Sequence, residues 1–473
     1  MFRIIYLIFL FLLSALGVYL GFNSTIIPNI ALYLIILFDI VNIVLIAIFI
    51  KKRKKRRIVL IILGILLSII LILANVIIGF VYYKSNSFFN KITNIEYETS
   101  NYVTIVLKDS SFNKLNDVKN IGLFYNEIDK NYKDALEELN EKTDANTTEY
   151  ENILLLVTDI LAKKIDAIFV NENYIDIIDE GNENIKDSIR VIDTITISTE
   201  TKKIKQEITD IKKLNSFNIY ISGIDTYGAI TNVSRSDVNI IATVNISENK
   251  VLLTNTPRDY YVQLHGTTGN RDKLTHAGVY GIDMSIKTLE DLYNTKINYY
   301  VRVNFNTLIS LVDEIGGVDV YSDQALVTHH YNVYIKQGWN HLNGEAALGY
   351  ARERYSYLEG DRHRGQNQQQ IIEAIIKKVT KTNDPNTYLK LLNTLENSMQ
   401  TNVDKKMING IINLQVKNNY NWQIESISVN GYDDGGYTYS YPGQYLYVMQ
   451  PDYNSLEAAK KKINDLLNKK EEN

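Results

Sequence analysis

Arginine and aspartate residues recur at the ends of the predicted strands in the second half of the chain. Asp225 follows one predicted strand, Arg235 and Asp237 precede the next, and Arg258 follows a third. The forked guanidinium group of arginine matches phosphate oxygens in pairs, and open α/β sheets bind their ligands at strand ends. This pattern predicts a pocket for a ligand that carries more than one phosphate charge.

The carboxylates in this group need a counter-charge, because on their own they would repel such a ligand. A divalent cation between the carboxylates and the phosphates removes the conflict, and hard oxygen ligands favour Mg²⁺ or Mn²⁺. We therefore predict that Asp225 and Asp237 lie at a metal ion.

A second group of polar residues follows in the region 350–370. Its members are Arg352, Arg354, Asp361, Arg364 and Gln368, and Lys273 stands between the two groups. For any single Arg or Asp a surface ion pair is the commoner explanation, so the prediction depends on the convergence of these residues. His276 and His363 are interpreted as structural histidines, since neither has an evident catalytic partner in the sequence.

The elements that must position these residues form a layered α/β domain over 214–473. Runs at 218–222, 238–244, 251–255 and 299–305 predict strands, and apolar residues at helical spacing predict helices around 308–315, 371–379 and 455–467. Alternating strands and helices predict an α/β/α arrangement around a central sheet.

A smaller domain is predicted over 84–213. Its expected strands are 102–107, 121–125 and 167–170, its expected helices are 132–139 and 150–161, and 198–213 is interpreted as a polar connector. This accessory α/β domain contains no glycine-rich phosphate loop. The sequence leaves open whether it acts in spacing, partner contact or regulation.

Three apolar runs at 4–20, 30–50 and 58–81 predict a membrane anchor over 1–83 with three transmembrane helices. A signal peptide is the alternative for the first run alone, but no cleavage site follows it. Seven consecutive bases at 51–57 separate the second and third runs, and short basic loops stay in the cytoplasm. The prediction is a multi-pass protein of the cell membrane, with both C-terminal domains extracellular. Asp39 lies within the second run and is expected to face another helix.

Charge and composition exclude several classes of protein. Residues 1–57 carry a formal charge of +7, so the remainder carries −11 of the total of −4. A nucleic-acid partner is not expected, because a nucleic-acid binder would show the opposite sign over its folded part. The chain has no cysteine, which excludes disulfides, thiolate catalysis and zinc held by sulfur.

Several short motifs occur in a fixed order between about 216 and 379. They are 223–226, 235–237, 257–259, 273–277, 303–305, 316–318, 342–346, and the group of Arg352, Arg354, Gly360 and Asp361. In sequence and order they closely resemble the LytR-CpsA-Psr family. One such block can match by chance, but the whole ordered series cannot.

The resemblance implies a phosphotransferase that takes an anionic glycopolymer from a polyprenyl-pyrophosphate carrier and attaches it to peptidoglycan through a phosphodiester. Capsular polysaccharide and wall teichoic acid are the polymers implied, and the residues match the family motifs as follows. Asp225 and Asp237 match the carboxylates near magnesium; Arg258, Arg352, Arg354 and Arg364 match the arginines that grip the pyrophosphate, with Gln368 and Asp361 beside them; Arg235 and Lys273 match further motif positions at the substrate.

The resemblance also implies an apolar tunnel for the polyprenyl chain, although the sequence does not distinguish tunnel residues from ordinary core residues. Many members have an arginine at the position of Asn367, and 355–359 lengthens the last motif. The three spans and the added domain are similar to those of capsule-type members. Other envelope polymer-assembly proteins are possible partners.

Two other classes of function stay open at this point. A polyprenyl-pyrophosphate pyrophosphatase would use the same cations, with water as the acceptor. A non-catalytic, lipid-binding regulator of envelope assembly would need the arginines but would gain nothing from Asp225 and Asp237, since carboxylates without a metal weaken anion binding.

Overall fold

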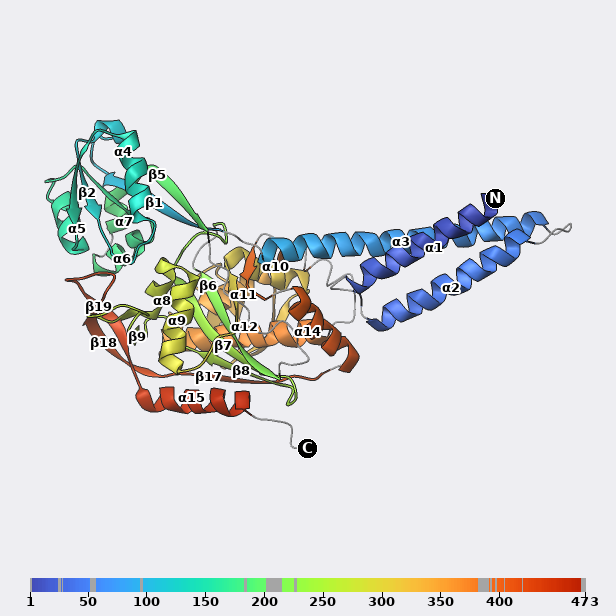
Figure 1. Ribbon diagram of the computed structural model, residues 1–473. Helices are drawn as coiled ribbons and strands as arrows, with labels where there is room; N and C mark the ends of the chain where they lie inside the picture. The colour runs from blue at the N-terminus through green and yellow to red at the C-terminus, as the bar shows by residue number, and fades with distance from the viewer. Residues whose placement is uncertain are drawn as a thin grey trace.

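The computed structural model describes residues 2–23, 27, 29–51, 57–93, 97–182, 185–200, 215–224, 228–381, 391, 394–395, 398–403, 405–418 and 420–468. Three long helices open the chain: α1 (Phe2–Phe22), α2 (Asn29–Lys51) and α3 (Arg57–Thr93). They pack side by side away from the rest of the molecule (Figure 1). Each contains an apolar stretch long enough to cross a membrane, which confirms the prediction of three N-terminal spans.

Polar side chains inside this bundle contact one another across helices. Asp39 is 2% exposed and its carboxylate accepts hydrogen bonds from Ser14 and, at 3.3 Å, from Nδ2 of Asn75. The prediction that Asp39 faces another helix is confirmed. The basic residues 52–56 lie outside the described residues, and α3 continues to Thr93, past the predicted end of the anchor at 83.

The middle domain is a five-stranded sheet with helices packed on it. Its strands are β1 (Tyr97–Leu107), β2 (Asn120–Phe124), β3 (Asn146–Tyr150), β4 (Ala167–Asn171) and β5 (Ile189–Glu200), in the order β3-β2-β4-β1-β5. Its helices are α4 (Tyr132–Lys142), α5 (Ile153–Leu161), α6 (Tyr174–Gly181) and α7 (Ile185–Ser188). The expected strands and helices are all present, together with β3, β5, α6 and α7, which the sequence did not predict. The strand β5 extends to Glu200 and so includes the start of the predicted connector.

The C-terminal domain is built on a six-stranded sheet. Its strands are β6 (Ser216–Ile224), β7 (Ser236–Asn245), β8 (Lys250–Asn255), β11 (Tyr299–Val303), β16 (Met399–Thr401) and β17 (Gln423–Ser428), in the order β16-β11-β6-β7-β8-β17. The central strands β6, β7 and β8 are antiparallel, while β11 pairs with β6 and β17 pairs with β8 in parallel.

Helices cover both faces of this sheet, as predicted for an α/β/α domain. One face, with Tyr220, Ile241 and Leu252, packs against α8 (Leu274–Ala277), α9 (Ile282–Tyr293) and α15 (Tyr453–Asn468). The other face lies towards α10 (Phe305–Glu314), α12 (Asp361–Lys381) and α14 (Lys405–Asn418), with α11 (Gly344–Arg352) beside α10 and α12.

The two outer domains share a hydrophobic core. Val279 and, from a hairpin that the sequence did not predict, Tyr441 and Leu446 belong to the same buried cluster as Ile177 and Ile178 of α6. The hairpin pairs β18 (Gly431–Tyr437) with β19 (Tyr445–Pro451) and reaches the middle domain (Figure 1). The accessory domain is therefore docked on the C-terminal domain.

Candidate active site

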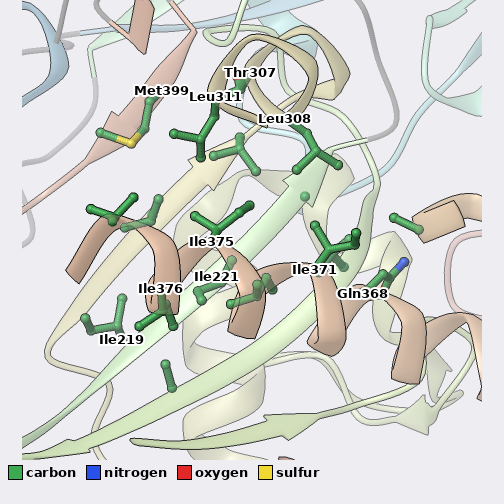
Figure 2. Close-up of a pocket in the computed structure, with 18 of the residues that line it drawn as sticks. Ile219, Ile221, Thr307, Leu308, Leu311, Gln368, Ile371, Ile375, Ile376 and Met399 are labelled. Carbon is green, nitrogen blue, oxygen red and sulfur yellow. The ribbon is translucent and has the colours of Figure 1, made fainter. Parts of the chain in front are cut away.

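A cavity of about 620 Å³ lies between the central sheet and helices α10, α12 and α14. Most of its wall is apolar: Ile219 and Ile221 project from β6, Leu308 and Leu311 from α10, and Ile371, Ile375 and Ile376 from α12 (Figure 2). The same cavity is lined by Asp237, Arg258, Arg352, Arg354, Arg364 and Gln368. The structure therefore brings six of the predicted site residues to one space, beside a long apolar surface.

Local backbone features bring these side chains together. The pairing register of β6 and β7 shifts at Gly223 and Ile224, close to the start of β7 where Asp237 lies. Gly365 lets the first turns of α12 approach β8 closely, because a Cβ at this position would lie 2.2 Å from Nδ2 of Asn255. Arg364 and Gln368 on α12 consequently line the same cavity as Arg258, which follows β8.

Asp237 and Arg258 form the centre of the charged group. Nη1 of Arg258 donates to Oδ2 of Asp237 at 2.9 Å, and the Thr275 hydroxyl donates to Oδ1 at 3.0 Å. The side chains of Arg258 and Asp237 are both 14% exposed. Burial alone would raise the pKa of Asp237, but the cations of Arg258, Arg235 and Arg364 outweigh it and hold that pKa well below its usual range. Asp237 is therefore an anion at neutral pH.

Asp361 contacts this charged group through Arg364 but is not among the residues that line the cavity. It is the first residue of α12 and forms an ion pair with Arg364, three residues later. Burial raises the pKa of Asp361, and the nearby carboxylates of Asp259 and Asp237 add to this effect against the lowering by Arg364 and Arg258. Two carboxylates with pKa values moved in opposite directions are a common feature of acid–base sites.

Arg352, the last residue of α11, and Arg354, which follows that helix, both line the cavity. The Arg352 guanidinium carbon lies 4.2 Å from the ring centroid of Phe305, at the start of α10. Arg354 lies 4.8 Å from the ring centroid of Tyr355 and donates to its hydroxyl at 2.8 Å. Stacking on aromatic rings fixes the plane of each guanidinium group at the cavity.

Arg235 and Lys273 are not among the residues that line the cavity. Their side chains face helix α6 of the middle domain, where Lys273 donates to Glu180 at 2.6 Å and Arg235 donates to the same carboxylate at 3.1 Å. Nζ of Lys273 also lies 3.5 Å from Oδ1 of Asp259. These two predicted substrate-binding residues thus lie beside the charged group and contact the accessory domain.

Asp225 lies outside the described residues, so its predicted pairing with Asp237 is not visible. Within the part of the chain that the structure describes, no group of three or more His, Asp or Glu side chains is arranged to hold a metal ion. The donor that the structure does show is the carboxylate of Asp237, which is ionised and lines the cavity. An anionic oxygen donor suits Mg²⁺ or Mn²⁺.

The buried histidine at the site has a partner that was not recognised in the sequence. Nδ1 of His276 lies 2.7 Å from Oδ1 of Asp272, and both side chains are fully buried. Asp272 also accepts hydrogen bonds from the backbone and hydroxyl of Ser440. His276 therefore belongs to a buried network that ties α8 to the β18–β19 hairpin, in keeping with its interpretation as structural.

Two sets of site residues were missed in the sequence. The residues of the apolar cavity wall could not be distinguished from ordinary core residues, because isoleucines at helical spacing on α12 mark an inward face whether that face meets side chains or a void. Glu180 gave no signal, since it lies 93 residues from Lys273 in the chain. Only the three-dimensional packing of α6 shows it.

Comparison with known proteins identifies relatives of the chain. A model of the LytR_cpsA_psr family matches residues 184–462. A protein of Bacillus subtilis named polyisoprenyl-teichoic acid–peptidoglycan teichoic acid transferase TagV is 30% identical over 272 residues, which cover 56% of this chain and 68% of the relative. The corresponding transferase TagU of Bacillus cereus is 34% identical over 200 residues, 42% of this chain and 64% of the relative.

The crystal structure of B. subtilis TagV is also similar, with 30% identity and a TM-score of 0.47 over 54% of this chain and 98% of that structure. The family model matches more than half of the chain, so the resemblance carried by the sequence motifs is confirmed. The protein belongs to the LytR_cpsA_psr family.

Proposed function

We propose that this protein is a membrane-anchored phosphotransferase that moves an anionic glycopolymer from a polyprenyl-pyrophosphate carrier to peptidoglycan. The observation that supports this proposal is a single cavity in which an extended apolar wall meets the arginine side chains of residues 258, 352, 354 and 364. A polyprenyl pyrophosphate matches both parts of this cavity, since its apolar chain fits the apolar wall and its phosphates fit the arginine side chains. The names of the two relatives, both teichoic acid transferases, support a polymer of that class, with capsular polysaccharide as the alternative.

In the proposed reaction, a hydroxyl oxygen of the acceptor attacks the phosphorus that bears the polymer. The bond from this phosphorus to the bridging oxygen breaks, and polyprenyl phosphate leaves with the electron pair of that bond. Such transfers depend on positioning and charge neutralisation more than on a covalent nucleophile. Arg352, Arg354 and Arg364 hold the leaving phosphate, and Arg258 holds the phosphate that is transferred.

The acceptor hydroxyl must lose a proton in this step, and Asp361 is the better of the two candidate bases. A general base works best when its pKa is close to the working pH. Both carboxylates pair with an arginine, but burial raises the pKa of Asp361, whereas the surrounding cations lower the pKa of Asp237. We therefore assign the base to Asp361 and a permanent negative charge to Asp237.

A divalent cation, Mg²⁺ or Mn²⁺, forms part of the proposal. Asp237 and Asp225 would hold it, and it would supply positive charge next to the phosphate oxygens. The ionised state of Asp237 at the cavity wall supports this role.

The topology of the protein is also proposed. The N-terminus and the basic loop lie in the cytoplasm, and everything after α3 lies outside the cell. A lipid-linked substrate stays in the bilayer, so an enzyme anchored in the same bilayer meets it at high effective concentration.

Substitution in living cells tests the proposed function. Arg354→Ala and Asp237→Ala should each abolish covalent attachment of polymer to the wall, measured as phosphate or sugar in purified peptidoglycan, while the protein stays in the membrane. Arg271→Ala is the matched control, because Arg271 belongs to the same domain but is exposed. Attachment that survives both site substitutions would refute transfer. Release of free polymer without attachment would instead indicate a pyrophosphatase.

A further inference from the structure

We propose that Glu180, on helix α6 of the accessory domain, is a positioning residue of the transfer site, which makes the accessory domain a working part of that site. The inference rests on the proposed function of the C-terminal domain. It adds a residue from a different domain, outside the motifs of the sequence.

Glu180 is the shared partner of two buried cations. Its carboxylate lies 2.6 Å from Nζ of Lys273 and 3.1 Å from Nη1 of Arg235, and these side chains are only 5% and 10% exposed. Asp176, one helical turn earlier, lies 3.0 Å from Nη2 of Arg235. Removing a close partner from a buried charge is destabilising. Glu180 is the nearer of the two carboxylates at Lys273, so it determines where that ammonium lies, whereas Arg235 is also held by Asp176.

The contact continues as an alternating series of charges that ends in the cavity. Nζ of Lys273 lies 3.5 Å from Oδ1 of Asp259, and Oδ2 of Asp259 lies 3.4 Å from Nε of Arg258. Arg258 in turn donates to Asp237. Glu180 of the accessory domain is thus linked through Lys273 and Asp259 to the guanidinium group of Arg258, which lines the cavity.

Loss of the Glu180 charge has a definite consequence for this series. The Lys273 ammonium would be left with Asp259 as its nearest carboxylate, and would draw that carboxylate away from Arg258. Arg258 then loses one of the two anions that orient its fork. A displacement of about 1 Å in a catalytic group can reduce a rate roughly 10²-fold, so the effect on transfer should be large even though Glu180 is remote from the cavity wall.

The docking of the accessory domain holds Glu180 in place. Tyr174 on α6 hydrogen-bonds through its hydroxyl to that of Tyr280 at 3.0 Å, and Asn126 donates to the same hydroxyl at 3.1 Å. Asn182, just after α6, donates to the hydroxyl of the fully buried Tyr441 at 2.7 Å. A shared apolar core surrounds these hydrogen bonds. We therefore treat α6 as a fixed part of the site and not as a segment that leaves it when substrate binds.

The test uses the full-length protein in membranes or detergent, with lipid-linked polymer and peptidoglycan as substrates. Glu180→Gln should lower kcat roughly 10- to 100-fold while KM for the donor changes less than about twofold, because the cavity that holds the donor is unaltered. The matched control is Asp179→Asn on the same helix, whose carboxylate faces Lys186 and not the site. This control should keep wild-type kcat.

A second variant separates positioning from general stability. In the double variant Glu180→Gln, Lys273→Met, the ammonium that competes with Arg258 for Asp259 is gone. Asp259 therefore returns to Arg258, and the double variant should be no slower than Glu180→Gln alone. If Glu180→Gln unfolds, Glu180→Asp retains the charge at a shifted position and should give an intermediate kcat. A wild-type kcat in that variant would overturn the proposal.

Three outcomes are distinguishable in this experiment. A Glu180→Gln protein as active as the wild type overturns the positioning role and leaves the proposed function intact. A Glu180→Gln protein more active than the wild type shows that Glu180 masks the cations, which also overturns the proposal. Absence of transfer by the wild-type protein refutes the proposed function itself.

Discussion

The charged residues of the site hold one another in position before any ligand binds. Arg258 contacts both Asp237 and Asp259, and Arg364 contacts Asp361. Groups that are already oriented need no reorganisation when charge develops on a phosphate, and this is the main way in which a site without a covalent nucleophile accelerates transfer. The arrangement makes individual arginines hard to replace.

Arg258→Lys should be nearly as harmful as Arg258→Ala. A lysine keeps the positive charge but lacks the fork that spans a carboxylate and a phosphate oxygen together. We expect each variant to lose roughly 10²- to 10³-fold in kcat, as for loss of one preorganised donor. Transfer of labelled polymer to isolated peptidoglycan measures the effect. A lysine variant with more than about a third of wild-type activity would show that charge alone is sufficient at this position.

The raised pKa of Asp361 predicts a specific pH dependence. A base must be ionised to accept a proton, so transfer should decline as the pH falls through the pKa of Asp361, which burial places above the ordinary aspartate value. Rates measured between about pH 4 and 7 should show this decline in the wild type. Asp361→Asn should be slow at every pH and should lack the decline; if it retains the wild-type profile, another group is the base.

The site could be predicted from the sequence only where its residues lie in short motifs. The sequence predicted Arg352, Arg354 and Arg364 as one group because they lie close together along the chain. Arg235 and Lys273 were equally conspicuous, yet their side chains face α6 and do not line the cavity. A motif fixes which residues are near one another along the chain, but the direction of a side chain depends on what packs against it.

Among the secondary-structure elements, α12 serves two functions with one face. Its first turns supply Arg364 and Gln368 to the polar part of the cavity. Its later turns supply Ile375 and Ile376 to the apolar part (Figure 2). Helical spacing of apolar residues predicted this helix correctly. The β18–β19 hairpin was missed because β18 contains Asp433, Asp434 and three glycines, and both residue types are depleted in strands.

A bulky side chain on α12 should close the cavity without harming the fold. Ile375→Trp adds volume where the structure has empty space, so the usual cost of overpacking should be small. We expect at least about a tenfold loss of lipid that copurifies with the protein, measured by mass spectrometry. Lys377→Trp introduces the same residue on the exposed side of α12 and should retain the lipid. Equal lipid content in the two variants would contradict binding in this cavity.

At the scale of the whole molecule, the absence of cysteine makes the membrane topology directly measurable. A single cysteine at Glu141, which is exposed in the accessory domain, should react with a membrane-impermeant maleimide on intact cells. A single cysteine at Lys54, in the basic loop, should react only after permeabilisation. The opposite labelling pattern would place the catalytic domain in the cytoplasm and would exclude peptidoglycan as its acceptor.

The length of α3 has a consequence for how substrate reaches the protein. The helix has 37 residues, which corresponds to about 55 Å, whereas the hydrocarbon core of a bilayer is about 30 Å thick. Its C-terminal part packs against β16, the edge strand from which Met399 enters the cavity wall. In the proposed topology, the part of α3 beyond the hydrocarbon core holds the cavity wall at Met399 at a fixed distance from the membrane surface. A carrier lipid would have to span that distance to bind in the cavity.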